Sequence, residues 1–376
     1  MTQTNRFIKL VKRPEGRPTP EIFSHEEAPI AALKSGEFLI KNLILSMDPA
    51  LVGRMRDEDN YTESVNPGEV MHAYGVGQVI ESKHNKVKVG ELRFGRLDMQ
   101  EYAVCKKASE YRKINAGLAD PSWYLSVVGI TGATAYFSLY DVCKPKQGET
   151  ILISAGGSSV GSVVAQLAKY EGCRTVAIVS TDAKAEEVKK EWGYDAAVSY
   201  RGKSIEELSR DLGYACPNGV DIYYDNTSGD ISEAVMDHYN DFARIAVIGR
   251  LGITHLSDTR LDTGRRDNNL ILAKRITKQG FVLLDYQSKI MGAILKLAKM
   301  LKQGELKIKE DYLHGIDQTP AAFFRMLDGE SKGKQLVKLG EVNDQLDPSP
   351  RWLGNALTAE KFPTTPLVKL LTGGIA

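Results

Sequence analysis

The chain contains a series of short, strand-like apolar runs that recur about every 22–25 residues between residues 150 and 284. Most gaps between these runs have helical periodicity; after the first run, Val160, Val163, Val164 and Leu167 fall on one helix face. Alternation of strands and helices predicts a parallel sheet covered on both faces, which excludes most other folds. The six predicted strands are residues 150–154, 175–179, 196–198, 221–224, 244–248 and 280–284.

The segments on either side of this region have a different pattern of apolar residues. The first 125 or so residues hold short apolar runs broken by proline and glycine, which predicts a mainly β module. Residues 290–303 and 320–327 have helical patterns, and residues 335–339 have a strand pattern. The last 36 or so residues are proline-rich without periodicity. A chain of 376 residues is long enough for two domains and a short extension.

Charge and cysteine content exclude several classes of protein. Lysine and arginine number 49 against 48 aspartate and glutamate residues, so no overall field favours nucleic acid or an anionic membrane. The four cysteines form no CxxC pair and are typical of buried thiols in a reducing compartment. The sequence has no apolar run of about 18 residues, no signal-peptide core and no retention signal, so we expect a cytoplasmic protein without a membrane anchor.

A glycine-rich turn links the first predicted strand to a helix. Its pattern is Gly156-x-Ser158-x-x-Gly161, in which serine replaces the middle glycine of a dinucleotide-binding motif. Free N–H groups and the positive end of the helix dipole favour a pyrophosphate at such a turn. A purely structural turn is the alternative, but the place at the first strand–helix junction favours binding. The candidate loop residues are Gly156, Gly157, Ser158, Ser159, Val160 and Gly161.

The end of the second predicted strand bears on the choice between NAD and NADP. Ser180 and Thr181 stand where an NAD enzyme commonly has a carboxylate for the ribose 2′-hydroxyl. Lys184 follows, and hydroxyl groups with a lysine suit a 2′-phosphate, which predicts NADP (NADPH). Asp182 argues against this prediction. In the alternative interpretation Ser180 or Thr181 caps the next helix, and capping and phosphate binding can coexist.

Over about residues 5–340 the chain resembles the zinc-independent medium-chain dehydrogenases/reductases, in the group of NADPH-dependent double-bond reductases. This group includes leukotriene/prostaglandin, alkenal and curcumin reductases. Several segments match in order, which makes the resemblance far more specific than the glycine loop alone. The matching segments are 129–136 (GITGATAY), 141–150 (DVCKPKQGET), 224–226 (YDN), 280–282 (GFV), 285–286 (DY), and Gly333-Lys334 with Val337.

The resemblance implies an α/β protein with a GroES-like, β-rich catalytic module and a Rossmann domain with a doubly wound parallel sheet. The implied catalytic module begins with residues 1–128 and returns with residues 289–342. Residues 129–288 are the implied NADP-binding Rossmann domain, and residues 343–376 are a C-terminal extension. The resemblance also implies a homodimer whose Rossmann sheets join edge to edge.

The resemblance assigns further cofactor contacts. Lys184 and Tyr200 match positions that contact the 2′-phosphate, and Thr131 matches a position beside the diphosphate or nicotinamide. The stretch around the ribose and nicotinamide is implied to include Asn226, Ile248, Gly249 and Arg250. Phe281 and Ser331 complete the candidate cofactor residues.

Zinc-containing members of the superfamily carry a cysteine, a Gly-His-Glu motif and a four-cysteine lobe. The segment Pro67-Gly68-Glu69-Val70-Met71-His72 lacks that arrangement, and the chain has no cysteine quartet. We therefore expect no metal, with His72 as a structural residue or a substrate contact. Without zinc, the chemistry must depend on hydride geometry and a hydroxyl proton donor.

The sequence departs from the family at positions that matter for this donor. Two usual tyrosine positions hold Ala50 and Ala273, so we expect a wider substrate pocket. Tyr61 matches a loop tyrosine of curcumin-type reductases, and Tyr74 stands where a glycine is common. The candidate catalytic residues are Tyr61, with Tyr74 and Tyr286 in reserve; an exposed loop tyrosine and a packed strand tyrosine are the alternative interpretations of the first two.

The favoured function is transfer of a hydride from NADPH to the carbon–carbon double bond of an α,β-unsaturated ketone or aldehyde. The enolate that develops would be stabilised by a phenol or by the cofactor's ribose hydroxyl, and water or Tyr61 would protonate the α-carbon. The alternatives are a quinone reductase, a pathway-specific reductase or cyclase using the same cleft, and a redox-inactive NADPH-binding protein.

Overall fold

The computed structural model describes residues 3–57, 63–117, 119–343 and 345–346. The chain divides into two compact units. Residues 1–14, 18–128 and 310 onward form the first unit, and residues 15–17 and 129–309 form the second. Nearly all of the predicted C-terminal extension lies outside the described residues.

In the division into compact units, the return to the first unit begins at Glu310, whereas the resemblance implied residue 289. The reason is helix α8 (Ile290–Lys302), which packs against α2 (Ile130–Phe137) of the second unit. Ala293 of α8 is buried in one apolar cluster with Ala133 and Phe137 of α2. The sequence pattern marked the helix correctly but carried no information on which unit it covers.

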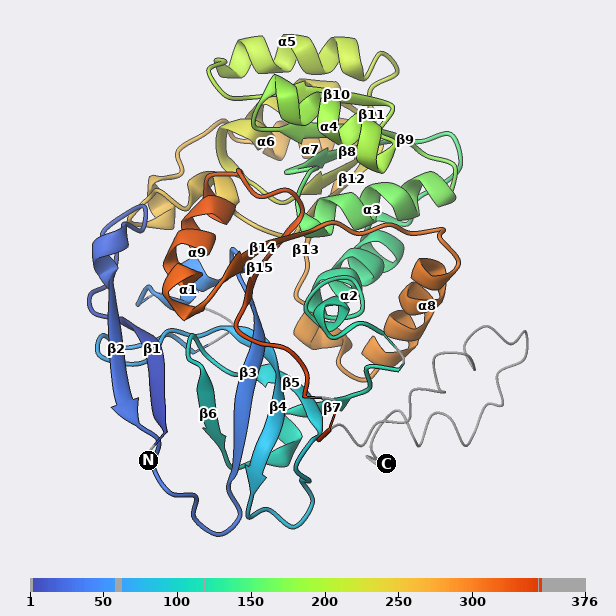
Figure 1. Cartoon of the computed structure of the whole chain (residues 1–376). Helices are drawn as coiled ribbons and strands as arrows, with labels where there is room; N and C mark the ends of the chain where they lie inside the picture. The colour runs from blue at the N-terminus through green and yellow to red at the C-terminus, as the bar shows by residue number, and fades with distance from the viewer. Residues whose placement is uncertain (1–2, 58–62, 118, 344, 347–376) are drawn as a thin grey trace. The chain divides into compact units, whose positions relative to one another are not determined.

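The first unit is β-rich, as the sequence predicted. In its described part a seven-stranded sheet runs in the order β14-β15-β3-β4-β5-β7, with β6 paired to β3, and β1 and β2 form a separate ribbon (Figure 1). Strands β14 and β15 lie far along the chain, and β15 joins the sheet antiparallel to β3. The elements are β1 (Thr4–Leu10), β2 (Phe23–Pro29), β3 (Phe38–Ser46), α1 (Leu51–Arg54), β4 (Tyr74–Ser82), β5 (Leu92–Arg96), β6 (Tyr102–Cys105), β7 (Arg112–Ile114), β14 (Glu310–His314), α9 (Thr319–Leu327) and β15 (Lys334–Lys338).

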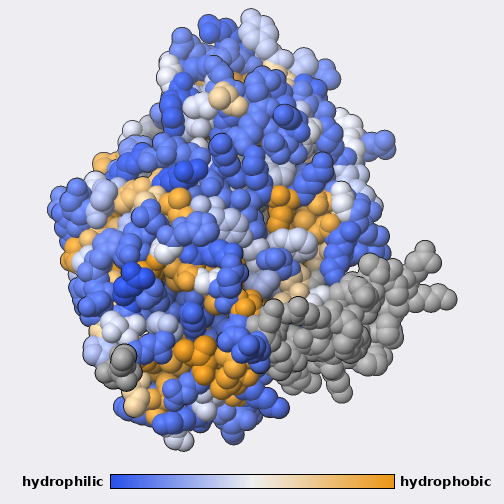
Figure 2. Space-filling model, in the orientation of Figure 1, coloured by the Kyte–Doolittle hydropathy of each residue, from blue (hydrophilic) through white to orange (hydrophobic). Residues whose placement is uncertain are grey.

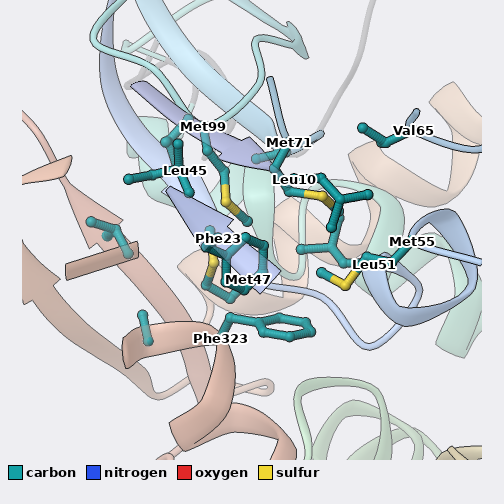
Figure 3. Close-up of a cluster of buried hydrophobic side chains, with 14 of the residues drawn as sticks. Leu10, Phe23, Leu45, Met47, Leu51, Met55, Val65, Met71, Met99 and Phe323 are labelled. Carbon is teal, nitrogen blue, oxygen red and sulfur yellow. The ribbon is translucent and has the colours of Figure 1, made fainter. Parts of the chain in front are cut away.

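The core of the first unit is rich in methionine (Figure 3). Phe23 meets Phe323 of α9 edge to face, with ring centroids 6.0 Å apart. Unbranched methionine side chains fill irregular gaps between elements that meet at varied angles. The labelled core residues are Leu10, Phe23, Leu45, Met47, Leu51, Met55, Val65, Met71, Met99 and Phe323.

In the described part of the second unit, six parallel strands form a sheet in the order β10-β9-β8-β11-β12-β13. By chain order this is 3-2-1-4-5-6, the arrangement of a Rossmann fold. The sequence-predicted α/β fold with a doubly wound sheet is therefore confirmed. The elements are α2, β8 (Thr150–Ser154), α3 (Ser159–Tyr170), β9 (Arg174–Val179), α4 (Asp182–Trp192), β10 (Ala196–Ser199), α5 (Ile205–Ala215), β11 (Val220–Asp225), α6 (Gly229–Val235), β12 (Tyr239–Val247), α7 (Asn268–Lys274), β13 (Thr277–Gly280) and α8.

The sixth predicted strand, 280–284, is wrong. Strand β13 ends at Gly280, and residues Leu283–Tyr286 form a 3-10 turn. The apolar side chains of Phe281 and Leu283 pack onto the α2–α8 cluster. Their apolar character therefore comes from helix contacts and not from a sheet.

The covering helices are amphipathic. Helix α5 buries Leu208 and Leu212 in the core that includes Leu152 of β8 and Tyr223 of β11. Its start is a capping box, since the side chains of Ser204 and Glu207 each accept a hydrogen bond from the other's backbone N–H. The outer surface over α4 and α5, at the top of the view, is largely hydrophilic (Figure 2). Burial of one face against the sheet therefore accounts for both helices.

Candidate functional site

Four loops follow the carboxyl ends of neighbouring parallel strands in the second unit. They come after β8, β9, β11 and β12. The chain runs outward from β8 to β9 and β10 and then returns to β11 on the other side of β8. Ligands of open α/β sheets bind at this edge, where the strand order reverses. Most of the sequence-predicted cofactor residues lie on these four loops.

The glycine loop after β8 has no room for larger residues. A Cβ on Gly161 would lie 2.6 Å from the carbonyl oxygen of Ala155. The Ser158 hydroxyl accepts a hydrogen bond from the Gly161 N–H at 3.1 Å and is the N-cap of α3. Serine at the middle motif position therefore starts the helix. First-turn amides lack intrahelical acceptors, so the predicted Ser159 and Val160 can offer theirs to an anion.

Tyr194, which the sequence analysis missed, holds the glycine loop. Its buried hydroxyl lies 3.0 Å from the carbonyl oxygen of Gly156 and 3.1 Å from that of Gly161. A Cβ on Gly156 would lie 3.0 Å from the same hydroxyl oxygen, so the close approach requires glycine. Burial raises the pKa of Tyr194, so the hydroxyl keeps its proton and donates. No local pattern marks this residue, which stands in the turn before β10.

The predicted 2′-phosphate residues follow β9. The Thr181 hydroxyl accepts a hydrogen bond from the Lys184 N–H at 3.2 Å and caps α4, as the alternative interpretation proposed. The Lys184 side chain nevertheless runs along the glycine loop, because its Cε would lie 3.0 Å from a Cβ on Gly157. The carboxylate of Asp182 accepts a hydrogen bond from the Ser199 hydroxyl. Asp182 is thus bound to the end of β10.

The ends of β9 and β10 are tied by backbone bonds. The Tyr200 N–H donates to the Val179 carbonyl oxygen at 3.0 Å, and the Arg201 N–H donates to that of Ser180 at 3.2 Å. Ser180 is buried and Tyr200 is half-buried. The structure therefore brings Ser180 and Tyr200 to neighbouring strand ends, on the same sheet edge as the glycine loop.

Asp225, within the matched segment 224–226, organises the loop after β11. Its carboxylate accepts hydrogen bonds from the N–H groups of Thr227 (3.0 Å) and Ser228 (2.8 Å) and from the Ser232 hydroxyl (2.8 Å). Ser228 has a φ of 57°, a left-handed conformation that costs energy for a residue other than glycine. The buried carboxylate supplies the hydrogen bonds that hold this strained turn.

The loop after β12 is hydrogen-bonded to the end of β11. The Asn226 side-chain amide donates to the Ser154 carbonyl oxygen at 2.7 Å. The N–H groups of Ile248 and Gly249 donate to the Asp225 carbonyl oxygen at 2.8 and 3.2 Å. The structure therefore brings Asn226, Ile248 and Gly249 together across β8, β11 and β12, and exposed Arg250 follows them.

Thr131 lies in α2, and Tyr286 packs against the same helix. Thr131 is buried in the first turn of α2. Tyr286 stacks on Phe137, with ring centroids 4.6 Å apart, and contacts Phe281. Burial and Asp141 raise the pKa of Tyr286. Tyr286 is therefore placed against the end of α2 and the π-helical turn that follows it.

The remaining candidates belong to the first unit or lie outside the described residues. Tyr61 is outside the described residues. Tyr74 begins β4, where its ring stacks on Phe94. Burial, with Arg96 and Arg54, lowers the pKa of His72 to about 4, so the imidazole is neutral at pH 7. Ser331 is buried just before β15.

Two searches of the described residues bear on the metal and membrane predictions. Residues 3–57, 63–117, 119–343 and 345–346 contain no group of three or more His, Cys, Asp or Glu side chains arranged to hold a metal ion. None of the helices in the same residues is long and apolar enough to cross a membrane. The absence of metal stays a prediction, which elemental analysis of the purified protein tests.

Two family models match the chain. One, described as the N-terminal domain of oxidoreductase, matches residues 6–114, and one, described as zinc-binding dehydrogenase, matches residues 159–299. An NADP-dependent oxidoreductase of Bacillus subtilis, YfmJ, is 38% identical over 91% of this chain and 99% of its own length. The chain belongs to the zinc-independent medium-chain dehydrogenase/reductase family, in its NADPH-dependent double-bond reductase group. It is an NADP-dependent oxidoreductase, as predicted.

Other similarities agree with this assignment. The NADP-dependent 2-alkenal reductase of Nicotiana tabacum is 34% identical over 81% of this chain and 87% of its own length. The structure of CurA from Vibrio vulnificus in complex with NADPH is 33% identical, with a TM-score of 0.82 over 89% of this chain and 99% of that chain.

Proposed function

We propose that the protein reduces the carbon–carbon double bond of α,β-unsaturated ketones or aldehydes with NADPH. The observation that carries the proposal is the set of strand-end loops that offers backbone N–H groups, a lysine and a buried asparagine on one sheet edge. The tobacco relative is named for 2-alkenals, which are substrates of this class.

The residues of the second unit fit a dinucleotide phosphate. The glycine loop would hold the pyrophosphate, since a Cβ at Gly156 or Gly161 would occupy the tightly packed turn. Lys184 and Tyr200 would hold the 2′-phosphate, and the engagement of Asp182 by Ser199 removes the carboxylate that argued for NAD. Asn226 and the backbone at 248–250 would line the ribose and nicotinamide.

Bound NADPH supplies a hydride. As the β-carbon gains it, the electron pair of the double bond moves to the carbonyl oxygen, and a proton added at the α-carbon completes the saturated product. A hydrogen-bond donor at that oxygen, either a phenol of the chain or the cofactor's ribose hydroxyl, would stabilise the charge that develops there in the transition state. A tyrosine with an ordinary pKa of about 10 is protonated at neutral pH and donates without special tuning.

Tyr61 remains the first candidate for this donor, and the described residues favour Tyr74 over Tyr286 as the reserve. The hydroxyl of Tyr74 has no hydrogen-bond partner in the described part of the chain, so it is free to bind a substrate oxygen. Tyr286 is held by aromatic neighbours and Asp141.

The experiment for this function is anaerobic NADPH oxidation against a panel of enones, enals and quinones. Turnover of enones and enals to saturated products supports the proposal. Turnover of quinones alone would assign the alternative reductase activity. Tight NADPH binding with no turnover of any acceptor would favour a redox-inactive binding protein.

We also propose a cytoplasmic homodimer joined at β13. In the described part of the second unit, β13 pairs only with β12, and its four residues are exposed. An unpaired sheet edge is a natural template for a second copy. Buried, unpaired cysteines at all four positions suit the cytoplasm. Light scattering should give about twice 41.4 kDa, and a clean monomer at micromolar concentration contradicts the dimer.

A further inference from the structure

One side-chain hydrogen bond joins the start of α4 to the last residue of β10. The Ser199 hydroxyl donates to the carboxylate of Asp182, which is the first residue of α4. Ser199 is buried, whereas Asp182 is exposed. In the parallel sheet, Ser199 lies beside Val179, the last residue of β9. The bond therefore lies between two neighbouring strand ends, at the sheet edge where we place the 2′-phosphate of the cofactor.

The two ends of this bond differ in their freedom to move. Ser199 is held by the pairing of β10 with β9, which the N–H of Tyr200 continues by donating to the Val179 carbonyl oxygen at 3.0 Å. Asp182 is an exposed side chain, and among the residues that the structure describes its carboxylate forms no ion pair and receives a side-chain hydrogen bond from Ser199 alone. The direction of the Asp182 carboxylate therefore depends on the Ser199 hydroxyl.

Lys184 points away from this carboxylate. Residues two positions apart on a helix do not face each other, so Asp182 and Lys184 project from different sides of the first turn of α4. The Cε of Lys184 would lie 3.0 Å from a Cβ on Gly157, which places the lysine along the glycine loop. The helix start thus separates a cation that faces the glycine loop from a carboxylate held at the end of β10.

A carboxylate at this edge has opposite effects on the two nicotinamide cofactors. It accepts a hydrogen bond from the ribose 2′-hydroxyl of NADH and repels the 2′-phosphate of NADPH. Asp182 is the third residue after the end of β9, near the place where NAD enzymes carry such an acid. The Ser199 bond keeps this acid on the β10 side.

We propose that Ser199 is a positioning residue that sets the preference for NADPH by holding the Asp182 carboxylate away from the 2′-phosphate. This inference rests on the proposed placement of that phosphate beside Lys184 and Tyr200. Without the hydroxyl, the carboxylate turns toward the cofactor and acts as the acid of an NAD enzyme. Cofactor choice is then made by a hydrogen bond within the protein as well as by direct contacts to the phosphate.

The test measures the dissociation constants of NADPH and NADH by calorimetry, without turnover. In Ser199→Ala we expect the constant for NADPH to rise about fivefold or more, because a like charge is released beside the 2′-phosphate. The constant for NADH should fall about twofold or more, because the released carboxylate accepts the 2′-hydroxyl. Ser199→Thr keeps a hydroxyl and should bind both cofactors like the unaltered protein. Damage to the fold would weaken both cofactors, so the opposite directions identify the proposed role.

A double variant shows whether Ser199 acts through Asp182. Asp182→Asn added to Ser199→Ala should restore NADPH binding, because an amide does not repel the phosphate. Glu186→Gln, which removes a 76% exposed charge from the same helix, is the matched control and should not restore it. Because no enone is involved, these results stand whether or not the protein reduces carbon–carbon double bonds. Unchanged binding in Ser199→Ala, equal losses for both cofactors, or an NADPH defect that persists in the double variant would overturn the proposal.

Discussion

The hydroxyl of Tyr194 lies 3.0 Å from the carbonyl oxygen of Gly156, at the start of the loop that would hold the cofactor's pyrophosphate. The same hydroxyl lies 3.1 Å from the Gly161 carbonyl oxygen in the first turn of α3. One buried side chain from the turn before β10 therefore fixes both ends of the glycine loop. Tyr194 acts as a positioning residue for that loop.

Replacing this hydroxyl gives the first prediction. Tyr194→Phe keeps the ring and removes the single O–H donor that the two carbonyl oxygens share, so the free energy of unfolding should fall by about 1–3 kcal/mol. The dissociation constant for NADPH should rise, while kcat at saturating NADPH stays the same. Tyr214→Phe is the control, because Tyr214 is 79% exposed. If both variants bind NADPH like the unaltered protein, Tyr194 does not position the loop.

The second prediction concerns cofactor choice. Lys184→Ala should weaken NADPH binding by about 1–3 kcal/mol, since a charge-assisted contact to the 2′-phosphate is lost. NADH binding should hardly change. Lys190→Ala, an exposed lysine on the same helix, controls for general charge. Equal losses for NADPH and NADH upon Lys184→Ala would reject the assignment.

Two buried groups in the first unit predict an unusual pH dependence of stability. Burial raises the pKa of Asp98 to about 6, against the opposing effect of Arg96. The protonated carboxyl therefore stabilises the folded state at a pH below the pKa that Asp98 has in the unfolded chain, and this stabilisation is lost as the pH rises through 6. The pKa of His72 is lowered to about 4. The neutral imidazole therefore stabilises the folded state above pH 6.5, and this stabilisation is lost as the pH falls through 4. The two effects oppose each other over the same pH range.

A variant of either residue alone should therefore show the pH dependence of stability that the two opposing effects cancel in the unaltered protein. Each shift corresponds to roughly 3 kcal/mol at 1.36 kcal/mol per pKa unit. In Asp98→Asn only the His72 effect remains, so the free energy of unfolding should rise more steeply from pH 4 to pH 6.5 than in the unaltered protein. Urea unfolding at pH 4.5, 5.5 and 7 measures this. Parallel profiles for the two proteins would show that Asp98 titrates normally.

The proton donor gives a further prediction. Tyr61→Phe removes only the hydroxyl, and a positioned acid contributes about 10²–10⁴-fold, so kcat should fall at least tenfold with the KM for NADPH unchanged. A fall of less than about threefold would make Tyr61 a wall residue and Tyr74→Phe the next variant. Steady-state kinetics with one enone at saturating NADPH distinguish the two outcomes.

The sequence predicted most of the second unit because its information there is local. Strand runs and the glycine turn each depend on residues close in the chain. The errors came from contacts between distant segments: Phe281 and Leu283 are apolar because they meet α2, and α8 belongs with α2. Tyr194 acquires its role only from neighbours far along the sequence, which no spacing rule displays.

The central claim is hydride transfer to a carbon–carbon double bond, and an isotope experiment tests it directly. NADPH with deuterium at the transferable C4 position is incubated with a 2-alkenal, and the product is analysed by NMR and mass spectrometry. The account predicts a saturated aldehyde with deuterium at the β-carbon and a solvent-derived hydrogen at the α-carbon. Deuterium at the carbonyl carbon, in an unsaturated alcohol, or no deuterium transfer to any enone or enal, would contradict it.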